Sequence, residues 1–241
     1  MTDDADAADR TDASDRTDAA DRTDAADMTH HADTADPAET APRWSRVESF
    51  LRAHGAAGIP HPGGTLLAHL CRVRELLADW GADEAVQAAG MCHAAYGTDG
   101  FDRHLLPVAE RATLAEVIGD RAEALVHLYG SCDRGTVYPR IDPGRPVAFR
   151  DRFTGREHTV DDADLRAFLE ITAANELDVL AHNEELAERY GPALYRLFDG
   201  AGPLLSTAAR DACARQLAPH GPAPRAGKTM RDPGNRRTTG R

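Results

Sequence analysis

The sequence predicts a mainly α-helical domain that carries one small β-hairpin. Through most of residues 43–217, apolar side chains recur at the three- and four-residue spacing of helices. Glycines and capping residues separate the segments that have this spacing. Only residues 146–160, "PVAFRDRFTGREHTV", place strand-type residues on both sides of a two-residue turn.

The first half of the domain predicts three helices. Residues 43–55 have apolar positions at helical spacing and end at a glycine. A loop rich in proline and glycine, residues 58–64, leads to a second helix over 65–81, with Thr65 as its N-cap. A third helix is expected over 83–97. These segments would supply much of the helical core.

The second half predicts helices on both sides of the hairpin. Residues 111–130 indicate two short helices that are broken near Gly119. After the hairpin, residues 161–191 predict one long helix that begins with acidic residues, as the helix dipole favours. Its middle is apolar on nearly every side and should be buried. Two further helices are expected over 192–198 and 203–217.

Both ends of the chain have compositions typical of disordered tails. Residues 1–41 contain an Asp-, Ala-, Thr- and Arg-rich hexapeptide repeat, which matches neither helix nor strand and offers little apolar surface to bury. Residues 218–241 are rich in proline, glycine and arginine. We therefore expect a folded helical domain over 42–217 between an acidic tail and a basic tail.

Charge and composition narrow the functional classes. The net charge is −12, and the first 40 residues hold thirteen acids against three arginines. The remaining core has no basic stripe, so we do not expect nucleic-acid binding. No segment predicts a membrane span, the acidic start argues against a secretory signal, and four scattered cysteines suggest a reducing cytoplasm. The oligomeric state is not predicted.

Several polar residues fall on helix faces that should be buried. At 100° per residue, His69 and His93 lie within the apolar stripes of their helices. On the long helix, Asn175, Asp178 and His182 share one face. A buried carboxylate needs a charged partner or a metal. Either a divalent metal or a metal-free His–Asp–His hydrogen-bond network accounts for these residues.

Several motifs resemble the HD-domain metal phosphohydrolases, and more closely a group of uncharacterised HD-like domains with a His-small-x-Tyr-Gly-Thr signature. The matching segments are "LLAHLCRVRELLADWGADEAVQAAGMCHAAYG", "HAAYGTDGF", "VIGDRAEALV", "FTGRE" and "AANELDVL". The resemblance covers roughly residues 45–215 and implies an HD-like helical bundle. It assigns His69, His93 and Asp178 as ligands of a divalent metal.

One position departs from the HD pattern. The aspartate that follows the second histidine in HD hydrolases is Ala94 here, which can neither ligate a metal nor orient water. The three remaining ligands would form a mononuclear site with open positions. His61, in the loop before His69, is the nearest further ligand, while His104 and His127 are weaker ones. The missing carboxylate argues against the dinuclear iron oxygenases of the superfamily.

The candidate catalytic residues are Tyr96 and Asn175. Tyr96, with Thr98, would orient a phosphate or a water, although a tyrosine at a helix end often serves packing alone. Arg72 and Arg111 would either contact an anionic substrate or form exposed salt bridges.

Three functions follow from these residues. The first is a hydrolase that uses Fe, Mn, Zn or Ni to activate water against a small phosphoester. The second is a degenerate HD-like domain that binds a ligand or a partner without turnover, which Ala94 favours. The third is another metal-dependent reaction, by an oxygenase or a lyase, on the same ligands. A small molecule is the expected substrate or ligand.

Overall fold

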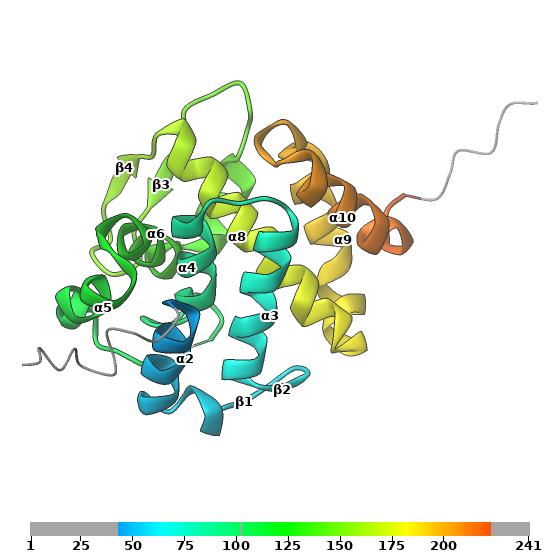
Figure 1. The fold of residues 1–241 in the computed structure, drawn as a ribbon. Helices are drawn as coiled ribbons and strands as arrows, with labels where there is room; N and C mark the ends of the chain where they lie inside the picture. The colour runs from blue at the N-terminus through cyan, green and yellow to red at the C-terminus, as the bar shows by residue number, and fades with distance from the viewer. Residues whose placement is uncertain (1–42, 102, 223–241) are drawn as a thin grey trace, which may run out of the picture. The chain divides into compact units, whose positions relative to one another are not determined.

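The computed structural model describes residues 43–101 and 103–222, and in this part the chain is mainly helical, as predicted (Figure 1). The α-helices are α2 (Arg43–Ala53), α3 (Leu66–Asp79), α4 (Glu84–Cys92), α5 (Arg111–Ile118), α6 (Asp120–Ser131), α7 (Arg134–Val137), α8 (Asp162–Ala181), α9 (Glu184–Gly200) and α10 (Thr207–Leu217). Short 3-10 turns lie between several of them.

Helices α3, α4 and α8 pack against one another and position the site (Figure 1). The Thr65 side chain accepts a hydrogen bond from the Ala68 amide and thereby starts α3, as predicted. Asp83 starts α4 in the same way. A Cβ atom at Gly90 would lie 2.1 Å from a methyl carbon of Leu77. The absence of a side chain at Gly90 therefore lets α4 approach α3 closely.

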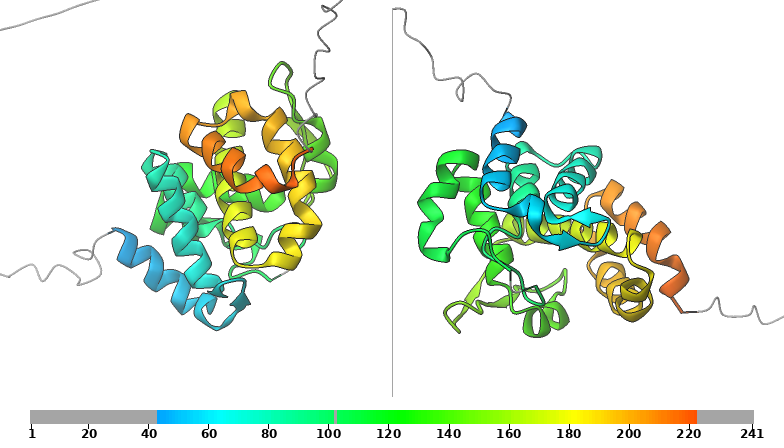
Figure 2. Two further views of the ribbon diagram at one scale, coloured as in Figure 1. Left: turned by 90° about the vertical axis from the view of Figure 1, so that its right-hand side faces the viewer. Right: turned by 90° about the horizontal axis from the view of Figure 1, so that it is seen from below.

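The predicted break near Gly119 is confirmed. Gly119 has φ +88° and ψ 155°, a conformation that only glycine adopts readily, and it separates α5 from α6. Helix α6 packs on α4 and α8, and α5 packs on α6. Figure 2 shows these helices from two further sides.

The predicted hairpin is also confirmed. Strands β3 (Ala148–Arg150) and β4 (Glu157–Thr159) pair antiparallel, with Phe149 opposite His158. A second, shorter hairpin was not predicted: β1 (Pro60–His61) pairs with β2 (Gly64–Thr65) in the segment expected to be a loop. This hairpin positions His61 beside the start of α3.

The helix boundaries near the C-terminus differ from the prediction. The predicted helix over 161–191 is two helices, because the Asn183 side chain accepts a hydrogen bond from the Leu186 amide and starts α9 there. The separate helix expected from Pro192 is wrong, since Pro192 lies inside α9. Helix α10 starts at Thr207, behind the Ser206 cap, and not at residue 203.

The predicted first residue of the C-terminal tail, residue 218, is too early in the chain. Residues 218–220 form a 3-10 turn that continues from α10 and packs against α9. A Cβ atom on Gly191 would lie only 2.4 Å from Cγ of the His220 ring. Glycine at position 191 therefore leaves room for His220. The acidic segment 1–41 and residues 223–241 lie outside the described residues. None of the helices in the described ranges is long and apolar enough to span a bilayer.

Candidate functional site: a buried histidine–aspartate–arginine cluster beside a cavity

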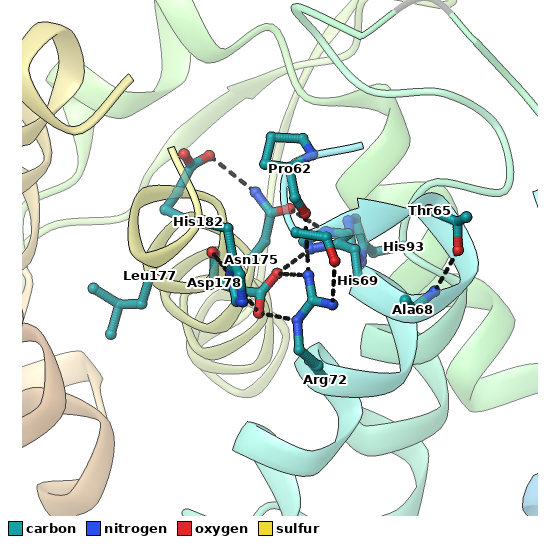
Figure 3. A network of polar contacts seen from close by, with 12 residues as sticks. Pro62, Thr65, Ala68, His69, Arg72, His93, Asn175, Leu177, Asp178 and His182 are labelled. Atoms are coloured by element: carbon teal, nitrogen blue, oxygen red, sulfur yellow. Dashed lines mark hydrogen bonds and ion pairs between the residues drawn. The ribbon is translucent and has the colours of Figure 1, made fainter. Parts of the chain in front are cut away.

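The structure brings His69, Asn175 and Asp178 together in the interior, as the helical angles predicted (Figure 3). His69 faces inward from α3 and is fully buried, and Asp178 of α8 is 4% exposed. The His69 Nδ1 atom lies 2.6 Å from Asp178 Oδ2. Because an ionised carboxylate only accepts hydrogen bonds, Nδ1 donates in this contact.

The second nitrogen of His69 is also engaged. Its Nε2 atom lies 3.1 Å from Asn175 Oδ1, and the amide nitrogen of Asn175 donates to Glu176 Oε1 at 3.1 Å. The bond to Glu176 sets the orientation of the amide, so an oxygen faces His69. Nδ1 therefore donates to Asp178 and Nε2 faces the Asn175 oxygen, so each ring nitrogen has a polar partner within the protein.

Arg72 completes the cluster, one helical turn after His69. Its Nε and Nη2 atoms donate to Oδ1 and Oδ2 of Asp178 at 2.6 and 2.9 Å, a bidentate ion pair. Burial alone would raise the pKa of Asp178, but the hydrogen bonds from His69 and Arg72 outweigh it and lower the pKa to about 2. Asp178 is therefore a carboxylate whose charge is already balanced.

Arg72 also holds the β1–β2 turn over the cluster. Its guanidinium donates to the carbonyl oxygens of Pro62 and Gly63 at 3.1 and 3.3 Å. Gly63 has φ +78°, and a Cβ atom there would lie 2.6 Å from the His182 ring and 2.7 Å from Arg72 Nη2. Glycine at this position thus permits both the turn and the approach of Arg72.

The Arg72 contact was not predicted from the sequence. An exposed salt bridge was one of two expectations for this side chain, and it is wrong for Arg72, because its partner Asp178 is buried. The available signal was the spacing: Arg72 follows His69 by three residues, so both lie on the same helix face.

His93 lies at the C-terminal end of α4 and is 2% exposed. Its Nδ1 atom lies 2.7 Å from the Gly90 carbonyl oxygen and must donate to it. Burial, with a further contribution from the charge of His69, holds the pKa of His93 well below its usual value, so the ring is neutral. Its Nε2 atom, which makes no hydrogen bond within the described residues, is consequently an open acceptor.

His61 stacks on His69, with ring centroids 4.1 Å apart. Its Nδ1 atom is buried and has no hydrogen-bond partner among the described residues. Burial lowers the pKa of His61 to about 4. The expected further ligand therefore does lie at the cluster.

The other sequence candidates lie elsewhere or contribute no polar ligand. The hydroxyl of Tyr96 donates to Glu123 at 2.9 Å, and Arg111 donates to both oxygens of Glu123 at 2.7 and 2.6 Å. This geometry does not support the catalytic role expected for Tyr96. Ala94, at the position of the HD aspartate, is 2% exposed. His104 lines a separate cavity near Tyr96, and His127 lies on the Tyr96 side as well.

A cavity of about 490 Å³ adjoins the cluster. His61, His93 and Asn175 line it together with apolar residues of α8 and α9. Arg134, Tyr138 and Glu176 also line it, and none of them was a candidate from the sequence. Arg134 donates to Glu176 Oε1 at 2.9 Å, so its charge is paired. Arg134 lies on the one-turn helix α7 and Tyr138 on the 3-10 turn that follows it, and both elements are too short to show a periodic pattern in the sequence.

The donor set does not fit a metal in this arrangement. Both oxygens of Asp178 and both nitrogens of His69 have protein partners. A metal at these atoms would have to displace the Arg72 guanidinium. No group of three His, Cys, Asp or Glu side chains able to hold a metal occurs in residues 43–101 and 103–222.

Comparison with known proteins gives one match. No curated protein and no solved structure matches the chain. Residues 50–134, which include His61, His69, Arg72 and His93 but end before α8, are similar to a family described as a domain of unknown function (DUF6817).

Proposed function

We propose that residues 43–222 form an HD-like domain that binds a small molecule in the cavity beside His93, with Arg72 taking the place of a metal at Asp178. The bidentate pair between Arg72 and Asp178 is the observation that carries this proposal. A guanidinium supplies a permanent positive charge and two parallel donors, so it satisfies the buried carboxylate without an ion. Ala94 agrees with this, because it removes a metal ligand of the HD pattern.

The cavity is the second support. Its volume of about 490 Å³ lies in the range of sites that enclose small organic ligands. Apolar side chains of α8 and α9 form much of its wall, and a few polar groups converge on it from α4, α7 and α8. The cluster next to it would act as a rigid support, since its polar atoms are satisfied by one another.

A fragment screen tests this function. Full-length protein is screened against a fragment library by ligand-observed NMR, in parallel with Val179→Trp. Val179 lies at the cavity wall and is partly exposed, so the larger ring is expected to fill the cavity without disturbing the core. Hits that bind the wild type and are lost in Val179→Trp support the function. If no hit depends on residue 179, the cavity is not a ligand site.

A metal-dependent phosphohydrolase is the second candidate. It is favoured by the resemblance to HD hydrolases and by His93, whose Nδ1 is held by a backbone carbonyl in the way that orients metal-binding histidines. It requires Arg72 to leave Asp178. Elemental analysis of protein purified without chelators separates the two candidates: a stoichiometric transition metal favours the hydrolase.

A further inference from the structure

A second and smaller cavity, of about 250 Å³, lies beside Tyr96. Two segments that carried the sequence resemblance meet at its wall: "HAAYGTDGF" contributes Tyr96 and Gly97, and "FTGRE" contributes Phe153. Its other lining residues include His104, Leu106, Val108 and Arg152. The function proposed above uses none of these side chains, and we name this space the Arg152 cavity.

The Arg152 side chain is half-buried and held in place at this cavity. Its Nε atom donates to the Gly130 carbonyl oxygen at 2.7 Å, and its guanidinium carbon lies 4.6 Å from the centre of the Phe153 ring. Among residues 43–101 and 103–222, the two Nη atoms have no hydrogen-bond partner. A guanidinium that is already oriented loses less entropy when it binds an anion.

The charges near this cavity favour an anion. Arg152 is the one permanently charged side chain among the described residues that line it, and none of those residues is a carboxylate. Glu123 is paired with Arg111. Asp151 accepts hydrogen bonds from the backbone amide and the hydroxyl of Thr154 within its own turn, at 3.2 and 2.9 Å. A ligand in the Arg152 cavity therefore meets one uncompensated positive charge, in a chain whose net charge is −12.

The rest of the wall limits the size and the polarity of a ligand. Leu106, Val108 and Phe153 contribute apolar surface, and a volume of about 250 Å³ is smaller than that of most sites for drug-sized molecules. One arginine balances one negative charge, and the two oxygens of a carboxylate match the two Nη donors of a guanidinium.

We infer that the Arg152 cavity is a second ligand site, which binds a small monocarboxylate with an apolar body. The carboxylate accepts hydrogen bonds from the two Nη atoms of Arg152, and the apolar body packs against Leu106 and Val108. This inference goes beyond the proposed function and does not depend on it, because the two cavities share no lining residue.

Benzoate and benzamide test the ligand class, because they have nearly the same shape and differ in charge. Their dissociation constants are measured by NMR titration of the full-length protein at constant ionic strength, together with that of inorganic phosphate. We expect benzoate to bind at least about tenfold more tightly than benzamide, since only benzoate brings a negative charge to Arg152. Phosphate lacks an apolar body and should bind more weakly than benzoate. The inference is overturned if benzoate does not bind, if benzamide binds as tightly, or if phosphate binds more tightly.

Arg152→Gln locates the binding, because it removes the charge and the pair of Nη donors. We expect benzoate to bind at least about tenfold more weakly to this variant. Arg196→Gln is the matched control: Arg196 is exposed and lines a different cavity, so its loss removes the same charge elsewhere and should leave the affinity unchanged. Wild-type affinity in Arg152→Gln, or an equal loss in both variants, contradicts the site.

Val108→Trp tests the same cavity with Arg152 in place, and it decides the matter if Arg152→Gln does not fold. Val108 is partly exposed on the 3-10 turn before α5, so a larger ring there is expected to narrow the cavity. We expect benzoate binding to weaken at least about tenfold. Val179→Trp, at the wall of the cavity beside His93, should leave benzoate binding unchanged. Loss of benzoate binding in Val179→Trp alone would place the ligand in that other cavity and overturn the inference.

Discussion

Two buried carboxylates in this protein are held in nearly the same way, and their comparison shows which part of the candidate site is specific. Asp178 is paired with Arg72 and accepts a further hydrogen bond from His69. Glu123 is paired with Arg111 and accepts one from Tyr96. Each carboxylate is almost fully buried, at 4% and 5% exposure, and each arginine binds it with two donors.

The shared arginine pair explains why the Asp178 cluster is stable. The difference between the surroundings of Asp178 and Glu123 indicates where a ligand would bind. In both places a bidentate arginine balances the carboxylate, so the charge of Asp178 has a partner within the protein. Around Glu123, the polar side chains satisfy one another. Near Asp178, His93 Nε2, His61 Nδ1 and the Tyr138 hydroxyl have no hydrogen-bond partner among the described residues, and these three residues line the neighbouring cavity.

We expect the largest decrease in the free energy of unfolding when either arginine is replaced. Arg72→Met leaves the Asp178 carboxylate buried without its ion pair and should lower the free energy of unfolding by about 3 kcal/mol. Arg111→Met should cost less, because the Arg111 side chain is 42% exposed against 26% for Arg72. Urea denaturation at neutral pH measures both.

The double variant Arg72→Met, Asp178→Leu is the control for this prediction. It removes the unpaired charge together with its partner and should recover at least half of the loss. If Arg72→Met is as stable as the wild type, the ion pair does not balance Asp178.

A matched pair of hydroxyl deletions gives the next largest difference. Tyr96→Phe removes a hydrogen bond to the charged Glu123 and should cost about 2 kcal/mol. Tyr138→Phe removes a hydroxyl without a partner and should leave the free energy of unfolding unchanged or raise it by up to about 1 kcal/mol. Equal destabilisation by the two changes would mean that the Tyr138 hydroxyl has a partner within the protein.

The smallest effect concerns pH. The pKa of His61 is about 4 in the folded protein, mainly because of burial, against 6.5 when the ring is exposed. The unfolded chain therefore binds the proton at a higher pH, and the contribution of His61 to stability is lost as the pH falls from 6.5 toward 4. His61→Gln should accordingly lose less stability than the wild type between about pH 7.5 and pH 5.

The titration of the neighbouring groups does not mask this difference. His93 has the same sign and is present in both proteins, and Asp178 titrates at lower pH. Urea midpoints at the two pH values give the measurement. An identical drop in wild type and variant would contradict the assigned environment of His61.

Much of the fold and part of the site could be predicted from local pattern. Helical spacing and the Thr65 cap gave α3, and helical angles turned His69, His93 and Asp178 inward, where the structure buries them. The break at Asn183 was missed because Gly191 and Pro192 looked like the stronger interruption, whereas the structure keeps both inside α9.

Partners far apart in the chain could not be predicted from the sequence. Glu123 lies 27 residues from Tyr96, and Asp178 lies 106 residues from Arg72, so neither pair leaves a local signal. The cavity wall likewise combines residues of α4, α7, α8 and α9, and only packing brings them together.

The metal content of the protein tests most directly whether Arg72 takes the place of a metal. Wild type, Asp178→Asn and Glu123→Gln are purified without chelators or affinity metals and measured by elemental analysis. We predict far less than one equivalent of any transition metal in all three. A stoichiometric metal in the wild type that is kept in Glu123→Gln and lost in Asp178→Asn would contradict it.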